Sequence, residues 1–207
     1  MMKLYYSDVM APRKACALAR YLNAPVEFVY LDLVKGEHKT PAMLALNPNG
    51  RVPTLVDGAR VVWEADAIMF ALAERMNSDL WPRDAARQLE TLRWLSWAAH
   101  HFNPTAGQLY FEYVIKRRFD VGPPEAAQVE RATAEFRRLA RILDDHLQDR
   151  AWLAGDAMTI ADFSAAVTLP YAGDAHIPLA EFPAVRRWHD RLDALDAWRN
   201  PFPHAAA

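Results

Sequence analysis

The chain has little cysteine and no long apolar run, and each of these absences excludes a class of protein. Its single cysteine, Cys16, excludes an internal disulfide, and the lack of a Cys-x-x-Cys pair excludes a dithiol redox mechanism within one chain. No apolar run approaches the roughly 18 residues of a membrane-spanning helix. The start, Met1–Tyr6, runs directly into a predicted strand with no signal-peptide core. We therefore expect a cytoplasmic protein with no membrane partner.

The net charge is small, and the sequence contains no complete metal-binding pattern. The 207 residues include 24 Lys and Arg against 26 Asp and Glu, which leaves no electrostatic footprint for nucleic acid. The pair His100-His101 has no neighbouring cysteine or carboxylate to complete a metal site, so we expect no metal. Cys16 lies among small apolar residues of a predicted helix, which indicates a buried, inert thiol. A small ligand is the partner that this composition favours.

The pattern of predicted secondary structure changes after about residue 77. The first part alternates strands and helices, in the order strand 3–6, helix 12–22, strand 26–33, helix 41–46, strands 52–56 and 60–63, and helix 65–76. The first strand–helix–strand unit implies a right-handed crossover between parallel strands. This order is that of an α/β thioredoxin-like domain. We predict such a domain over 1–77, a polar linker, and an all-α domain over 85–207.

The second part reads as helices throughout. Its predicted helices cover 88–102, a continuation to 119 with a bend or interruption at Pro104, an amphipathic stretch over 125–147, and 183–195. Thr159 and Asp162 have the spacing of a capping box, which predicts a helix from there towards Leu169.

The segment Asn47–Gly58 carries the most informative pattern. Pro53 opens the first strand of a predicted hairpin that turns at Asp57-Gly58, and Glu64 stands just before the next helix. Because proline lacks a backbone N–H, Pro53 belongs at the first residue or edge of its strand. If the bond before it is cis, Val52 presents its N–H and C=O outward, free to pair with an extended peptide. The segment therefore predicts a site for a small peptide ligand.

These features together resemble the cytosolic glutathione S-transferases over essentially the whole chain. The similarity rests on Val52-Pro53 before the hairpin, on Glu64 before the next helix, and on Thr159–Phe163 in the helical part. The loop Lys35–Lys39 is also similar to that of phi-class members. The resemblance implies glutathione as co-substrate.

The resemblance assigns the parts of glutathione to short segments of the chain: the glycine carboxylate to His38 and Lys39, the cysteinyl backbone to Val52 with Pro53 cis, and the γ-glutamyl end to Glu64 and the Ala65 N–H. Arg51, beside them, adds positive charge. Such residues also occur on ordinary solvated surfaces, and an acidic residue also suits a helix start by about 0.3–1 kcal/mol. The family usually has Ser where Ala65 stands, so one hydroxyl contact is missing, although backbone N–H groups still bind a carboxylate.

The resemblance also implies that the glutathione thiol ionises near neutral pH, because the thiolate is the nucleophile. Lowering a free thiol pKa of about 8.5 by two units takes about 2.7 kcal/mol. Serine- and cysteine-type members use a side chain in the loop before the first helix, where this chain has Val9 or Met10. Neither donates a hydrogen bond. Three donors remain open: the hydroxyls of Tyr6 and Ser7, and the backbone N–H at Ala11.

We expect the backbone donors to carry much of this activation, with Tyr6 or Ser7 assisting. Ala11 is a poor N-cap, so the first N–H groups of the helix lack a side-chain acceptor. Arg13 and Lys14 make that helix end more positive, which favours a bound thiolate.

The expected co-substrate is small and apolar, in a pocket at the domain interface lined by Met10, Trp97, His101 and Tyr110. The resemblance implies a homodimeric detoxification enzyme in which the thiolate attacks an electrophile. Two alternatives stay open: a glutathione-dependent disulfide or peroxide reductase, and a non-catalytic interaction module that keeps the fold.

Overall fold

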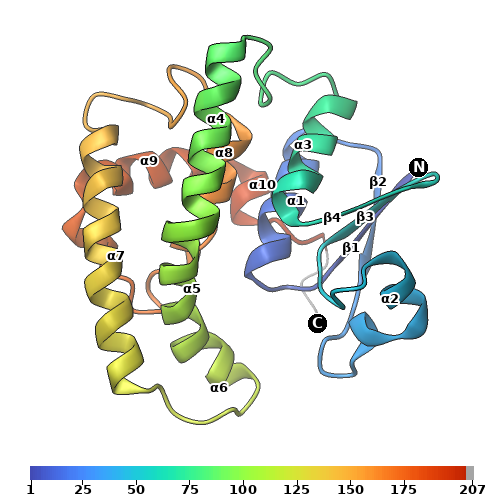
Figure 1. Ribbon diagram of the computed structural model, residues 1–207, viewed down its shortest axis with the longest axis horizontal. Coiled ribbons are helices and arrows are strands. Elements are labelled where there is room, and N and C mark those ends of the chain that lie inside the picture. The colour runs from blue at the N-terminus through green and yellow to red at the C-terminus, as the bar shows by residue number, and fades with distance from the viewer. Residues whose placement is uncertain (204–207) are drawn as a thin grey trace. The chain divides into compact units, whose positions relative to one another are not determined.

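The computed structural model describes residues 1–203, which form two compact units (Figure 1). The first comprises Met1–Trp81 together with the C-terminal segment that starts at Leu195, and the second comprises Pro82–Ala194. The first unit contains a mixed sheet with helices and the second is helical, so the predicted fold class is confirmed. No helix within residues 1–203 is long and apolar enough to cross a membrane.

The first unit is built on a four-stranded sheet in the order β2-β1-β3-β4. Its strands are β1 (Met2–Tyr6), β2 (Val26–Tyr30), β3 (Thr54–Asp57) and β4 (Arg60–Trp63). β1 pairs in parallel with β2, as the predicted crossover requires, and β3 pairs antiparallel with β4 in the predicted hairpin. β1 also pairs antiparallel with β3. The helices are α1 (Met10–Tyr21), the short 3-10 turn η1 (Glu37–Lys39), α2 (Pro41–Leu46) and α3 (Ala65–Arg75). α1 and α3 pack against each other.

Element boundaries shift by a few residues where proline governs the backbone. β3 begins at Thr54, two residues later than predicted, directly after Pro53. α1 begins at Met10, two residues earlier than predicted, so Pro12 lies inside its first turn. The first turn of a helix has no intrahelical use for its N–H groups, so proline is accepted there.

The C-terminal segment completes the first unit. Its short helix α10 (Asp196–Arg199) packs on α1, and the Trp198 side chain is fully buried. Arg13 donates a hydrogen bond from Nη2 to the Trp198 carbonyl at 2.5 Å, and its guanidinium lies 5.3 Å from the centre of the Trp198 ring. The sequence places this segment with the helical domain, whereas the structure packs it with the thioredoxin-like one.

The second unit is a set of helices joined by short turns. In order they are α4 (Ala85–Trp97), the π-helical turn η2 (Ala98–Phe102), α5 (Asn103–Tyr110), the π-helical turn η3 (Phe111–Ile115), α6 (Lys116–Arg118), α7 (Ala126–Leu147), α8 (Ile160–Ala165), the 3-10 turns η4 (Leu169–Tyr171) and η5 (Leu179–Glu181), and α9 (Pro183–Asp193). Pro104 does not interrupt the path from α4 to α6, because it lies in the first turn of α5, directly after η2.

The predicted capping box is confirmed, although α8 ends at Ala165, four residues earlier than predicted. Thr159 Oγ1 accepts from the Ala161 N–H at 3.3 Å, and Asp162 Oδ2 accepts from the Thr159 N–H at 2.8 Å. Asp162 Oδ1 also accepts from Trp188 Nε1 at 2.9 Å, which ties α8 to α9. Burial raises the pKa of the Asp162 carboxyl, and these donated hydrogen bonds oppose that shift.

Candidate functional site

The loop before β3 presents an open stretch of backbone. The Val52–Pro53 peptide bond is cis, as predicted. Val52 is half-buried, and neither its N–H nor its C=O has a hydrogen-bond partner within residues 1–203. Both groups are therefore available to an extended ligand, which is the property that the sequence assigned to this residue.

A buried asparagine at the end of α2 organises this loop. Asn47 is 3% exposed and donates hydrogen bonds from Nδ2 to the Arg51 carbonyl at 2.9 Å and to Thr54 Oγ1 at 3.2 Å. Its Oδ1 accepts from the Asn49 N–H at 3.1 Å, and its carbonyl accepts from the Gly50 N–H at 2.9 Å. These bonds flank Val52 on both sides and fix its backbone. Sequence reasoning missed this role, because an Asn-Pro-Asn-Gly run indicates only a turn.

The turn η1 lies beside the same loop. Gly50 has a φ of +57°, and a Cβ built on it would lie 3.2 Å from Leu44 Cδ2, 3.7 Å from Lys39 Cγ and 3.8 Å from the His38 carbonyl oxygen. The positive φ favours glycine at this position. The structure therefore brings His38 and Lys39 next to the segment that carries Val52, as the predicted site demands.

His38 and the two exposed cations of this region differ in environment. Burial, followed by the charge of Lys39, lowers the pKa of His38, so its ring is uncharged at neutral pH. Its Nδ1 is buried and has no hydrogen-bond partner in the part of the chain that the structure describes. Lys39 and Arg51 are exposed. An uncharged ring with an orphan nitrogen, next in sequence to the exposed Lys39, is a setting that suits an anionic ligand group.

The start of α3 also has an unpaired backbone donor. Glu64, the residue before the helix, has a φ of 71° and a ψ of 122°, a sparsely populated conformation that costs on the order of 1–3 kcal/mol. Its exposed side chain makes no capping hydrogen bond. The Ala65 N–H has no partner among the described residues. A strained residue directly before a helix whose first N–H is unpaired points to a ligand-binding role.

The start of α1 is likewise without a side-chain cap. Val9 is extended and makes no side-chain cap, and the first turn contains no acidic residue. The N–H groups of Met10 and Ala11 have no hydrogen-bond partner within the described chain. Since Met10 opens the helix, Ala11 is its second residue and not its cap, and its N–H still points out of the helix start.

The two candidate hydroxyls are less accessible. The Tyr6 side chain is fully buried, with its ring centre 6.1 Å from that of Phe28, 5.7 Å from that of Tyr30 and 5.8 Å from that of Phe202, on which it stacks. Ser7 is also fully buried, and its hydroxyl donates to Asp8 Oδ1 in a long contact of 3.4 Å. Among the three predicted donors, the backbone is therefore the most open.

The basic residues that follow are engaged elsewhere. Lys14 Nζ lies 2.5 Å from Asp66 Oδ1, and Arg13 is bound to the Trp198 carbonyl. Arg13 and Lys14 are each only 8% exposed. The positive charge that the sequence assigned to the start of α1 is thus directed towards α3 and α10. Cys16 is fully buried, and burial raises the pKa of its thiol, in keeping with an inert side chain.

The predicted co-substrate residues fall in both units. Met10 lies in the first, and the other three lie in the second, in different surroundings. Trp97 stacks on Phe102 at 5.4 Å between ring centres and so belongs to the packed side of η2. Tyr110 instead meets Tyr171 at 4.7 Å, and His101 is exposed. Within the second unit, Trp97 and Tyr110 therefore contact different partners.

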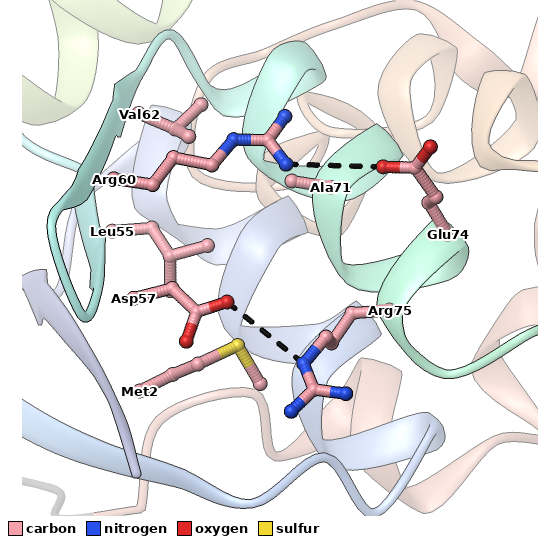
Figure 2. A pocket seen from close by; sticks show the side chains of 8 residues that line it. All are labelled: Met2, Leu55, Asp57, Arg60, Val62, Ala71, Glu74 and Arg75. Carbon is pink, nitrogen blue, oxygen red and sulfur yellow. Dashed lines mark ion pairs between the residues drawn. The ribbon is translucent and has the colours of Figure 1, made fainter.

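A separate pocket of about 280 Å³ lies between the β3–β4 hairpin and α3 (Figure 2). Arg60 lies 3.8 Å from Glu74 and Asp57 lies 3.8 Å from Arg75, so two ion pairs bridge the hairpin and the helix. Met2 and Leu55 contribute apolar surface. None of the predicted site residues lines this pocket, and it is distinct from the open backbone at Val52.

Known proteins share both the sequence pattern and the fold. A family model described as "Glutathione S-transferase, N-terminal domain" matches residues 2–74, and one described as "Glutathione S-transferase, C-terminal domain" matches residues 126–191. "Glutathione S-transferase 3" of Zea mays is 37% identical over 84% of this chain and 80% of its own. "Disulfide-bond oxidoreductase YfcG" of Escherichia coli is 27% identical over 95% and 92%. The crystal structure of glutathione transferase F7 from Populus trichocarpa superposes with a TM-score of 0.89 at 22% identity over 97% of each chain.

Proposed function

Because this chain belongs to the glutathione S-transferase family, we propose that its first unit binds reduced glutathione and uses the thiolate to attack a small, apolar electrophile. The observation that carries the proposal is the unpaired backbone of Val52, in the same unit as the uncapped starts of α1 and α3. An extended tripeptide with an anion at each end and a thiol in the middle matches that arrangement.

Each part of the ligand has a group of matching chemistry. The cysteinyl N–H and C=O pair with the C=O and N–H of Val52. The glycine carboxylate meets His38 and Lys39, with Arg51 adding charge nearby. The γ-glutamyl carboxylate accepts from the Ala65 N–H at the positive end of α3, beside Glu64.

The thiol loses its proton because donors at the start of α1 stabilise the anion. Hydrogen bonds to a charged group are worth about 1.5–3 kcal/mol, so one good donor supplies most of the roughly 2.7 kcal/mol that a two-unit shift requires. The Ala11 N–H is the donor that we assign, with Ser7 or Tyr6 assisting. The thiolate then displaces a leaving group: the sulfur–carbon bond forms, and the leaving group departs with the electron pair of its bond.

A reductive reaction is the second candidate. The site lacks an open hydroxyl donor, and one relative is named a disulfide-bond oxidoreductase. In that reaction the bound thiolate attacks the glutathionyl sulfur of a mixed disulfide, forms glutathione disulfide and releases the other thiolate. With a hydroperoxide, two glutathione molecules yield glutathione disulfide, an alcohol and water. An interaction module without turnover is the remaining alternative.

We further propose that the enzyme acts as a cytoplasmic homodimer, with Trp97, His101 and Tyr110 of the second unit contributing to co-substrate binding. Sedimentation at micromolar concentration tests the dimer. Substitution of Tyr110 by Ala should raise KM for the co-substrate and leave KM for glutathione unchanged.

The function is tested by binding to immobilised glutathione, followed by rates with a chlorinated aromatic, a hydroperoxide and a mixed disulfide. Turnover of the chlorinated aromatic supports the transferase, and turnover of only the other two supports the reductase. Binding without any turnover favours the interaction module. Arg60 lies on the β3–β4 hairpin, in the pocket of Figure 2, which none of the predicted site residues lines. Arg60→Ala therefore serves as a control and should retain both binding and turnover.

A further inference from the structure

An ion pair joins the N-terminal parts of the two helices that the proposed site uses. Lys14, just beyond the first turn of α1, places Nζ 2.5 Å from Oδ1 of Asp66, in the first turn of α3. The two side chains are 10% and 27% exposed, so water screens the pair only in part. α1 and α3 pack together, which keeps the partners in reach.

Asp66 occupies an electrostatically sensitive position. It follows Ala65, whose N–H we assign to the γ-glutamyl carboxylate. The positive end of a helix stabilises an acidic side chain in its first turn in the same way as it stabilises a bound anion. Two carboxylates at one helix end also repel each other. Left alone, Asp66 would therefore compete with the ligand for the start of α3.

We propose that Lys14 is a positioning residue for glutathione: it neutralises Asp66 and holds its carboxylate towards α1, which leaves the start of α3 open to the γ-glutamyl carboxylate. The inference rests on the proposed glutathione site and adds to it a determinant of affinity. Lys14 acts on the ligand through Asp66 and needs no contact with it.

The test compares glutathione Kd by calorimetry, together with Tm, in the wild type, Lys14→Met, Asp66→Asn and the double variant. Lys14→Met should weaken binding about tenfold, because it frees the Asp66 charge. Asp66→Asn alone should stay within about twofold of the wild type. The double variant should recover to within about threefold, and Lys14→Arg, which keeps the charge, should bind normally. A purely structural pair would lower Tm in both single variants and give no such recovery of Kd.

Cysteinylglycine, which lacks the γ-glutamyl group, provides the ligand control. Its affinity should be the same in the wild type and in Lys14→Met. The proposal is overturned if Lys14→Met leaves glutathione Kd unchanged, if the loss persists in the double variant, or if cysteinylglycine suffers an equal loss. If Lys14→Met does not fold, Lys14→Gln takes its place with the same outcomes. Failure of the wild type to bind glutathione would refute the proposed function itself, whereas normal wild-type binding with no effect of Lys14 would refute this inference alone.

Discussion

Removal of the Ala11 N–H should raise the pKa of the bound glutathione thiol by one to two units. The start of α1 has no side-chain cap and no acidic residue, so this N–H has no competing acceptor among the described residues. A hydrogen bond to a charged group is worth about 1.5–3 kcal/mol, and each pKa unit corresponds to about 1.4 kcal/mol. Loss of one such bond therefore accounts for about one to two units.

The single cysteine makes the experiment practical. Cys16 is the only cysteine of the chain, so residues 1–15 can be synthesised with lactic acid in place of Ala11 and ligated at Cys16 to the remaining residues. The resulting ester keeps the shape of the amide and lacks its N–H. The thiolate absorbance of bound glutathione, titrated against pH, gives the thiol pKa. The matched control is the ligated chain with every amide intact.

The reasoning has a clear point of failure. If the ester leaves the thiol pKa unchanged while Ser7→Ala or Tyr6→Phe returns it to the value of free glutathione, a side chain activates the thiol and the backbone account is wrong. Parallel replacement of Met10 by its ester analogue asks whether the neighbouring free N–H shares the role.

Three further outcomes are expected. Burial lowers the pKa of His38 from 6.5, so glutathione should bind more tightly as the pH falls through that lowered pKa and the ring gains charge opposite the glycine carboxylate. Calorimetry from about pH 5 to 8 should show this gain in affinity for the wild type. The same gain in His38→Gln would remove His38 from the site. Asn47→Asp keeps the acceptor and loses both donated hydrogen bonds, so it should weaken glutathione binding about fivefold at unchanged kcat; an unchanged Kd would contradict the role given to Asn47. Asp144 in α7 caps α9, because it accepts hydrogen bonds from the N–H groups of Ala184 at 2.7 Å and Val185 at 3.0 Å. Asp144→Ala should therefore lower the free energy of unfolding, measured by urea titration, by about 1–2 kcal/mol. A stability equal to that of the wild type would show that water replaces this cap.

Local signals were sufficient for most of the fold. α2 occupies 41–46 as predicted, because a proline opens it and a turn sequence ends it. The hairpin turns at Asp57-Gly58, where Gly58 adopts a φ of 60°. α10 was missed because its four residues carry no periodic pattern, and its stability comes from the burial of Trp198 against α1, more than 170 residues away in sequence.

The site was predictable in its segments and not in its contacts. The sequence identified His38, Val52 and Glu64 by pattern, and the structure places His38 beside the loop of Val52 through the close contact at Gly50. The ion pair of Lys14 with Asp66 joins residues 52 positions apart, and no local rule predicts such a partner. The burial of Tyr6 depends likewise on aromatic residues from distant segments.

A crystal structure of the complex with reduced glutathione tests the central claim most directly. We predict that the cysteinyl nitrogen and carbonyl oxygen of the ligand lie about 2.7–3.2 Å from the carbonyl oxygen and nitrogen of Val52. The γ-glutamyl carboxylate should lie at the start of α3, and the sulfur at the start of α1. Glutathione bound elsewhere, for example in the pocket of Figure 2, with the Val52 backbone left unpaired, would contradict the account.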